Sequence, residues 1–163
     1  MFHLIPRPLH IAALRIAHSI RAVWWSMSSG VTVGCRVLVL DQADRVLLIR
    51  HSYGSQRWMM PGGGLKRGED VLEAAQREVH EEVGITLSPV FELGISDEPL
   101  GGGRNHIHMI AGWTEDTPVP DGREVREARF FAAHDLPDYI AARIAGRIPD
   151  WITEAKAARH AAE

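Results

Sequence analysis

Cysteine is almost absent from this chain of 163 residues, in which Cys35 is the single example. One thiol cannot form a disulfide within the chain, so the sequence excludes a disulfide-stabilised scaffold and fits a reducing compartment. We therefore predict a cytoplasmic protein. The chain also lacks internal repeats, low-complexity runs and linkers. Its length suits one domain that buries a substantial core, so we expect a single domain over residues 1–163.

A long uninterrupted apolar run is also missing. Leu9 to Met27 is rich in apolar residues, but Arg15, His18 and Arg21 interrupt it. A membrane-spanning helix needs about 20 consecutive apolar residues, so we expect no membrane association. The few leading charges, and the lack of an A-x-A-like cleavage site before Gly30, also disfavour a signal peptide.

The chain has no excess of positive charge. It contains 18 Lys and Arg against 21 Asp and Glu, for a net charge of −3 with His neutral. Proteins that bind long nucleic acids usually show a basic excess or a basic cluster, so such a partner is disfavoured. A small phosphorylated ligand remains a candidate, because a few Arg side chains and a metal ion suffice to bind one. Apolar residues at 45% and charged residues at 24% are typical of a globular protein.

The first segment is predicted to be a helix. From Pro8 to Ser26, apolar residues recur at helical spacing, which makes residues 1–28 an extra N-terminal helix. Such a helix packs either on the domain or on a second subunit, so a homodimer is one interpretation. Another is that this helix docks a partner protein and that catalysis is secondary.

Strands and helices then alternate along the chain. A hairpin of residues 31–40 and 45–50 precedes a helix from Asp70 to Val83. Residues 138–163 form a predicted helical tail, with two short helices broken near Gly146 and Pro149. The sum is an α/β fold with a mixed sheet and helices on both sides. The remaining predicted strands are 90–96 and 106–114, around a loop at 97–104, and 124–131.

Three glutamates on the central helix are the main chemical signal. Glu78, Glu81 and Glu82 are spaced i, i+3 and i+4, so they lie on one helix face and repel one another. A bound divalent cation offsets that repulsion, and oxygen ligands without a His or Cys pair favour Mg²⁺, or Mn²⁺, over zinc. Taken alone, however, such a triplet is more typical of a solvated acidic face.

The surrounding residues support an organised site. Arg77 is spaced by four from both Glu73 and Glu81, so it can bridge two acids. Asp70 with Glu73 makes a capping box, and the glycines at 62–64 let backbone approach a metal or phosphate closely. An adjacent apolar stripe can anchor the helix to a sheet: Leu72, Ala75, Val79 and Val83.

The stretch from Gly63 to Ile85 resembles the Nudix box, G-x5-E-x7-R-E-U-x-E-E-x-G-U, where U is a bulky aliphatic residue. Every specified position is filled, and so many matches at fixed spacing make the signal specific. The likeness extends over about Val31 to Pro137, including the Trp58 to Gly63 entry. The matched positions are Gly63, Glu69, Arg77, Glu78, Val79, Glu81, Glu82, Gly84 and Ile85.

The resemblance implies an α/β/α sandwich and a magnesium-dependent pyrophosphohydrolase. Its substrate would be a nucleoside diphosphate linked to another moiety: a nucleotide sugar, a dinucleoside polyphosphate or a nucleoside triphosphate. The metal ligands would be Glu78, Glu81 and Glu82, with a backbone carbonyl at Gly62. Glu69 and Arg77 would orient those ligands. The alternative is a non-catalytic Nudix module that binds nucleotides for regulation, although an intact box disfavours it.

In many Nudix members an acid from a late loop acts as general base or metal ligand, and Glu124 is the first candidate here. Glu127, Glu115 and Asp116 compete with it. The alternative for each is an ordinary surface acid.

Substrate contacts are predicted outside the box. Arg50 or His51 would touch phosphate, Tyr53 would stack on a base, and Arg104 would reach the substrate from a glycine-rich loop. A solvated loop is the alternative for the first three. Three further arginines are interpreted as a solvated strand face: Arg123, Arg126 and Arg129.

Overall fold

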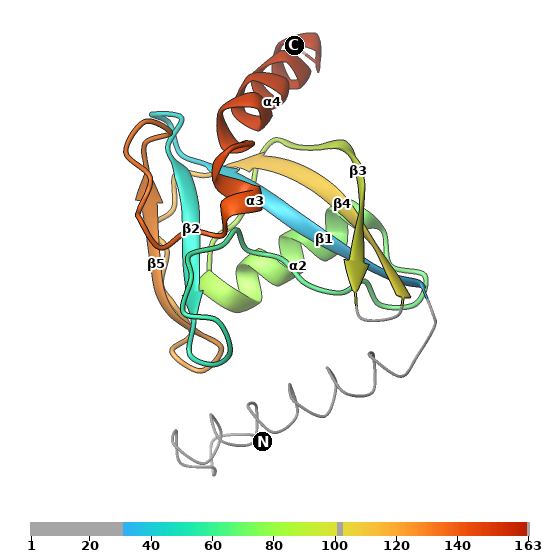
Figure 1. The fold of residues 1–163 in the computed structure, drawn as a ribbon. Helices are drawn as coiled ribbons and strands as arrows, with labels where there is room; N and C mark the ends of the chain where they lie inside the picture. Colours follow the sequence, from blue (N-terminus) through green and yellow to red (C-terminus); the bar gives the residue numbers. More distant parts are fainter. Residues whose placement is uncertain (1–30, 101–102, 163) are drawn as a thin grey trace.

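The computed structural model describes residues 31–100 and 103–162 (Figure 1). The predicted N-terminal helix lies outside the described residues. A five-stranded sheet forms the centre, in the order β3-β4-β1-β2-β5. The strands are β1 (Val31–Leu40), β2 (Val46–His51), β3 (Val90–Leu100), β4 (Gly103–Trp113) and β5 (Val125–Phe131).

The sheet is mixed, as predicted. β1 and β2 form the expected antiparallel hairpin, with Leu40 opposite Val46. β1 runs parallel to β4 along its whole length, from Val31 opposite Arg104 to Leu40 opposite Trp113. β3 with β4 and β2 with β5 are antiparallel. The parallel pair requires a long crossover between β1 and β4, and the central helix α2 lies within it.

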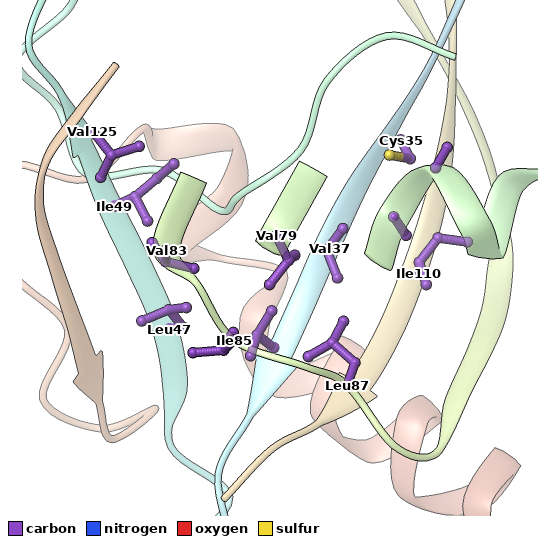
Figure 2. Packing of buried hydrophobic residues seen from close by; sticks show 13 residues of the cluster. Cys35, Val37, Leu47, Ile49, Val79, Val83, Ile85, Leu87, Ile110 and Val125 are labelled. Carbon is purple, nitrogen blue, oxygen red and sulfur yellow. The ribbon is translucent and has the colours of Figure 1, made fainter. Parts of the chain in front are cut away.

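Both faces of the sheet are covered. In β1, Val37 and Val39 point to one face while Leu38 and Leu40 point to the other, and all four are fully buried. α2 (Val71–Val83) packs on the first face, as Figure 2 shows for its residues Val79 and Val83. α3 (Ala142–Ala145) and α4 (Ile148–Ala162) cover the second. Two apolar layers on one sheet confirm the α/β/α sandwich.

The ends of α2 follow from their residues. The Asp70 carboxylate accepts hydrogen bonds from the backbone N–H groups of Leu72 and Glu73, which satisfies two donors of the first turn. Gly84 ends the helix at φ 69°, a left-handed conformation that glycine adopts without strain. The predicted helix bounds are therefore confirmed to within one residue.

One expectation about the strands was wrong. Of the predicted loop at 97–104, residues 97–100 lie in β3 and residues 103–104 lie in β4, and Asp97 pairs with His106. Acidic residues and glycines favour loops locally, but cross-strand partners stabilise the strand here, including the 2.7 Å ion pair of Arg36 with Glu98. The predicted tail of two helices broken near Gly146 and Pro149 is confirmed, although the second helix is not short: α3 ends at Ala145, and α4 runs for 15 residues from Ile148, with Pro149 in its first turn, where proline is tolerated.

Within residues 31–100 and 103–162, no helix is long and apolar enough to cross a membrane.

Candidate active site

The three box glutamates lie on one side of α2 at different depths. Glu82 is 6% exposed, and the Glu78 and Glu81 side chains are 17% and 59% exposed. Glu82 is therefore the most buried of the three glutamates, Glu78 is intermediate, and Glu81 faces the solvent. This is a wall of a site rather than a solvated acidic face.

Glu82 is a carboxylate in an unfavourable place for its charge. Burial raises its pKa well above the usual range, and the nearby acids Glu78, Glu124 and Asp121 raise it further. The backbone N–H of Gly62 donates to its Oε2 at 3.2 Å, which opposes the rise. A cation beside this carboxylate would favour its charged form.

The glycine run allows the chain to pass this close to the acids. A Cβ on Gly63 would lie 2.5 Å from the carboxyl carbon of Glu78, so no side chain fits there. Gly62 has φ 145°, and a Cβ there would lie 2.2 Å from the carbonyl oxygen of Cys35. The carbonyl of Gly63 accepts from the Cys35 N–H at 2.8 Å. The run is thus fastened to β1 on one side and faces Glu78 on the other.

Arg77 ties the box together. Its guanidinium makes a two-pronged contact with Glu69, at 2.7 and 2.9 Å, and donates to Glu78 at 2.7 Å. It also reaches Glu81 at 3.4 Å and the Gly64 carbonyl at 3.2 Å. The expected contact with Glu81 is present, whereas Glu69 and Glu78 take the place predicted for Glu73. These bonds raise the pKa of Arg77 and lower that of Glu69 to about 2.

The loop before β5 forms a second part of the site. Its key residue is Asp121, whose Oδ1 accepts from the backbone N–H groups of Arg123, Glu124 and Val125 at 2.8 to 3.0 Å. The Asp121 N–H donates to the carbonyl of Glu82 at 3.1 Å, which joins the loop to the end of α2. The loop conformation is therefore set by backbone bonds.

Ser52 holds the same loop from β2. Its N–H donates to the carbonyl of Glu124 at 2.8 Å, and its hydroxyl donates to the carbonyl of Arg123. The loop backbone is therefore anchored both to the end of α2 and to the residue that follows β2.

The helix and the loop together line a pocket of about 220 Å³. Glu124, the first candidate among the late acids, lies in this lining. Of its competitors, Glu127 pairs with Arg50 and Asp116 accepts from the N–H of Thr86. The lining residues are Glu78, Glu81, Glu82, Asp121, Arg123 and Glu124.

Sequence reasoning missed two of the lining residues. Asp121 is followed by Gly122 at φ 67°, and an Asp-Gly pair is a recognisable turn signal. Arg123 was interpreted as part of a solvated strand face, but it precedes β5 and lines the pocket. Arg126 and Arg129 do lie on β5, where both pair with Glu127 at 3.4 and 3.8 Å.

The four predicted substrate-contact residues are not among the residues that line this pocket. Arg50 donates to the Gln56 carbonyl at 3.0 Å, pairs with Glu127 at 3.3 Å and stacks over Trp58, so its guanidinium is engaged elsewhere. His51 and Tyr53 flank Ser52, with ring centroids 5.6 Å apart. Arg104 lies in β4 with its side chain 74% exposed, beside Asp97.

The pocket carboxylates are oxygen donors of the kind that divalent cations such as Mg²⁺ prefer. In the part of the chain that the structure describes, no three His, Cys, Asp or Glu side chains are arranged so that they could hold a metal ion by themselves. The donors nevertheless fit a cation that keeps water and substrate phosphates as its other ligands. Of the pocket-lining carboxylates, Glu78 lies beside Gly63 and Glu82 accepts from the Gly62 N–H, and positive charge would oppose the raised pKa of Glu82.

Comparison with known proteins identifies the class. The family model described as the NUDIX domain matches residues 30–152. A Bacillus subtilis protein, named provisionally as an 8-oxo-dGTP diphosphatase, is 27% identical over 120 residues, covering 74% of this chain and 79% of that protein. An RNA pyrophosphohydrolase of Legionella pneumophila (strain Corby) is 38% identical over 66 residues, 40% of this chain and 37% of that enzyme.

Solved structures agree on the fold. The crystal structure of a MutT NUDIX hydrolase from Burkholderia pseudomallei has a TM-score of 0.65 at 24% identity, covering 74% of this chain and 97% of that one. The chain belongs to the Nudix hydrolase family, and it is a hydrolase of phosphorus-containing anhydrides. The present chain spans most of the Bacillus relative but 37% of the Legionella enzyme.

Proposed function

We propose that this protein is a magnesium-dependent pyrophosphohydrolase that cleaves a nucleoside diphosphate linked to another moiety. One observation carries the proposal. Glu78, Glu81 and Glu82 of a complete Nudix box line one pocket together with Glu124 of a distant loop. The printed names of the two relatives concern different nucleotides but the same kind of bond, so the bond type is better supported than the nucleotide.

In this proposal Glu78, Glu81 and Glu82 hold the metal, with the Gly62 carbonyl as a further ligand; Mn²⁺ would serve as well. When bound, the metal lowers the pKa of a water molecule and neutralises charge on the phosphate oxygens. Arg77 fixes the carboxylate of Glu78, and Glu69 fixes Arg77. Displacement at phosphorus needs mostly positioning and charge stabilisation, which this network supplies.

Glu124 is the proposed general base. It takes the proton from the attacking water as oxygen bonds to phosphorus, and the nucleotide phosphate leaves with the electrons of the broken anhydride bond. Its place in the pocket lining supports the role, and so does the loop that Asp121 and Ser52 hold. A general base must lie within hydrogen-bond reach of the proton that it takes, so a held loop backbone favours proton transfer from the water to Glu124.

The nucleoside is proposed to lie beside His51 and Tyr53. Ser52, between them, is bonded to the loop that carries Glu124, so the ring pair adjoins the pocket. Substrate contact by Arg50 or Arg104 stays a prediction, as do a homodimer and cytoplasmic residence.

A panel assay tests the proposal. Wild-type protein and Glu82→Gln are incubated with nucleotide sugars, dinucleoside polyphosphates, nucleoside triphosphates and a 5′-triphosphorylated RNA. Each reaction is run with magnesium and with chelator, and phosphate release is measured after phosphatase coupling. We expect magnesium-dependent turnover that Glu82→Gln lowers by roughly 100-fold or more, because a ligand of the catalytic ion is lost.

Glu154→Gln is the matched control, since this exposed residue of α4 makes the same chemical change away from the pocket. Its activity should equal that of wild type. If no panel member is cleaved while nucleotides still bind, the protein is a binding module and the proposal is wrong.

A further inference from the structure

Among the described residues that line the pocket, Arg123 is the one arginine, beside five carboxylates. Five acids alone would repel a phosphorylated substrate, so a cation in this place affects how the pocket receives an anion. Arg123 is partly buried, and it belongs to the loop between β4 and β5. Neither the box motif nor the relatives' names assign it a role.

The backbone of Arg123 is held on both sides. Its N–H donates to Asp121 at 3.0 Å, and its carbonyl accepts from the Ser52 hydroxyl. The following residue, Glu124, is bonded to Ser52 at 2.8 Å and to Asp121 at 3.0 Å. The residue that carries the guanidinium is thus placed by α2 and β2 together, independently of any bond made by the side chain.

The guanidinium itself differs from the other arginines around the site. Arg77 uses its donors on Glu69, Glu78, Glu81 and the Gly64 carbonyl, and Arg50 uses its donors on Gln56 and Glu127. Among residues 31–100 and 103–162, Arg123 forms no ion pair within 4.0 Å, although carboxylates line the same pocket. Its planar set of N–H donors is available for a ligand.

We propose that Arg123 binds a non-bridging phosphate oxygen of the substrate and thereby selects for the phosphate part of the molecule. The inference rests on the hydrolase function proposed above. A guanidinium matches a phosphate with two parallel N–H···O bonds, which gives geometric selectivity as well as attraction. Glu124, one residue later, faces the water, so the loop positions the phosphate and the base together.

The test compares wild type, Arg123→Gln, Arg123→Lys and Arg129→Gln. For each protein, kcat and KM are measured at fixed free magnesium on the best substrate of the panel. The inhibition constant, or for an inactive protein the dissociation constant, of methylenediphosphonate is also measured. This probe carries two phosphorus groups and no nucleoside. Binding of Mn²⁺ without substrate is followed by electron paramagnetic resonance.

We expect Arg123→Gln to raise both KM and the methylenediphosphonate constant by about 10- to 100-fold, the usual loss for a hydrogen-bonded charge pair. Arg123→Lys should recover part of that loss, because it restores the charge but not the planar fork. Mn²⁺ binding should not weaken, since removing a cation leaves the carboxylates less neutralised. Arg129→Gln, an exposed arginine of β5, should stay within about twofold of wild type on the same physical grounds.

Two results would overturn the inference. One is an unchanged methylenediphosphonate constant in Arg123→Gln. The other is a change confined to Mn²⁺ affinity, which would show that Arg123 only neutralises the acids. Failure of the hydrolase proposal is distinguishable, because wild type would then cleave no panel member while the binding of methylenediphosphonate still decides the role of Arg123.

Discussion

The box segment, residues 62–84, and the late loop, residues 119–125, line the same pocket but are positioned by different bonds. In the box, charged side chains hold one another, with Arg77 at the centre of three glutamates. In the loop, the Asp121 carboxylate and Ser52 hold backbone groups. The side chains of the box restrain one another through ion pairs, whereas the loop is held through hydrogen bonds to its backbone.

This difference teaches where each part is vulnerable. The box depends on space and ion pairing, since Gly63 leaves no room for a Cβ beside Glu78. The conformation of the loop depends on one side chain, since a single carboxylate oxygen of Asp121 accepts hydrogen bonds from three backbone N–H groups. Adding a side chain at Gly63 or replacing the guanidinium of Arg77 should therefore lower activity through the box. Removing the carboxylate of Asp121 should instead act on the loop.

The largest effect is expected from Gly63→Ala. The new methyl group would lie 2.5 Å from the Glu78 carboxyl carbon, so that carboxylate must move. A displacement of about 1 Å in a catalytic group lowers the rate by roughly 100-fold, and we expect kcat/KM to fall at least that far. Gly64→Ala is the control, because nothing lies within 4 Å of its Cβ position. Equal kcat/KM values for the two variants would show that the close approach has no role.

The next effect is expected from Arg77→Lys. Lysine keeps the charge but cannot reach Glu69 and Glu78 with a planar fork. Loss of a group that orients metal ligands typically lowers activity by about 10- to 100-fold, and we expect kcat/KM to fall in that range. Arg67→Lys, in the exposed loop before α2, should retain wild-type activity. Full activity in Arg77→Lys would mean that charge alone suffices in the box.

A smaller effect is expected from the loop cap. Asp121→Ala removes the acceptor of three backbone N–H groups, and loss of a side-chain cap lowers the free energy of unfolding by about 1 kcal/mol. Asp121→Asn keeps an acceptor oxygen and should restore most of that stability. Urea denaturation measures both variants, with kcat/KM recorded in parallel. If Asp121→Asn were as unstable as Asp121→Ala, charge rather than the cap would hold the loop.

The smallest effect concerns pH. The Arg77 contact lowers the pKa of Glu69 to about 2, below its unfolded value near 4.5. Its contribution to stability is therefore complete above about pH 5 and decreases as the pH falls toward 2. The difference in urea midpoint between wild type and Glu69→Gln should shrink over that interval. A difference that stays constant from pH 6 to 3 would show that Glu69 and Arg77 do not interact in solution.

The box could be predicted from the sequence because its contacts are local. Asp70, Gly84 and the three glutamates all lie within one helix and its caps, where a spacing of three or four residues determines which side chains meet. The strand order and the late loop could not be predicted, because their contacts join distant segments. The β3–β4 hairpin shows the opposite case, in which tertiary pairing overrides a local preference for a loop.

The sequence by itself determined the family, the helix that carries the acids, and the two apolar layers on the sheet, because these depend on periodicity and a fixed motif. Only the tertiary structure decided that Glu124 and Arg123 line the pocket with the box acids, and that Arg50 is engaged elsewhere. The physical reason is distance along the chain. Ser52 and Glu82 each bond to the loop of residues 121–124, through hydrogen bonds that no local spacing encodes.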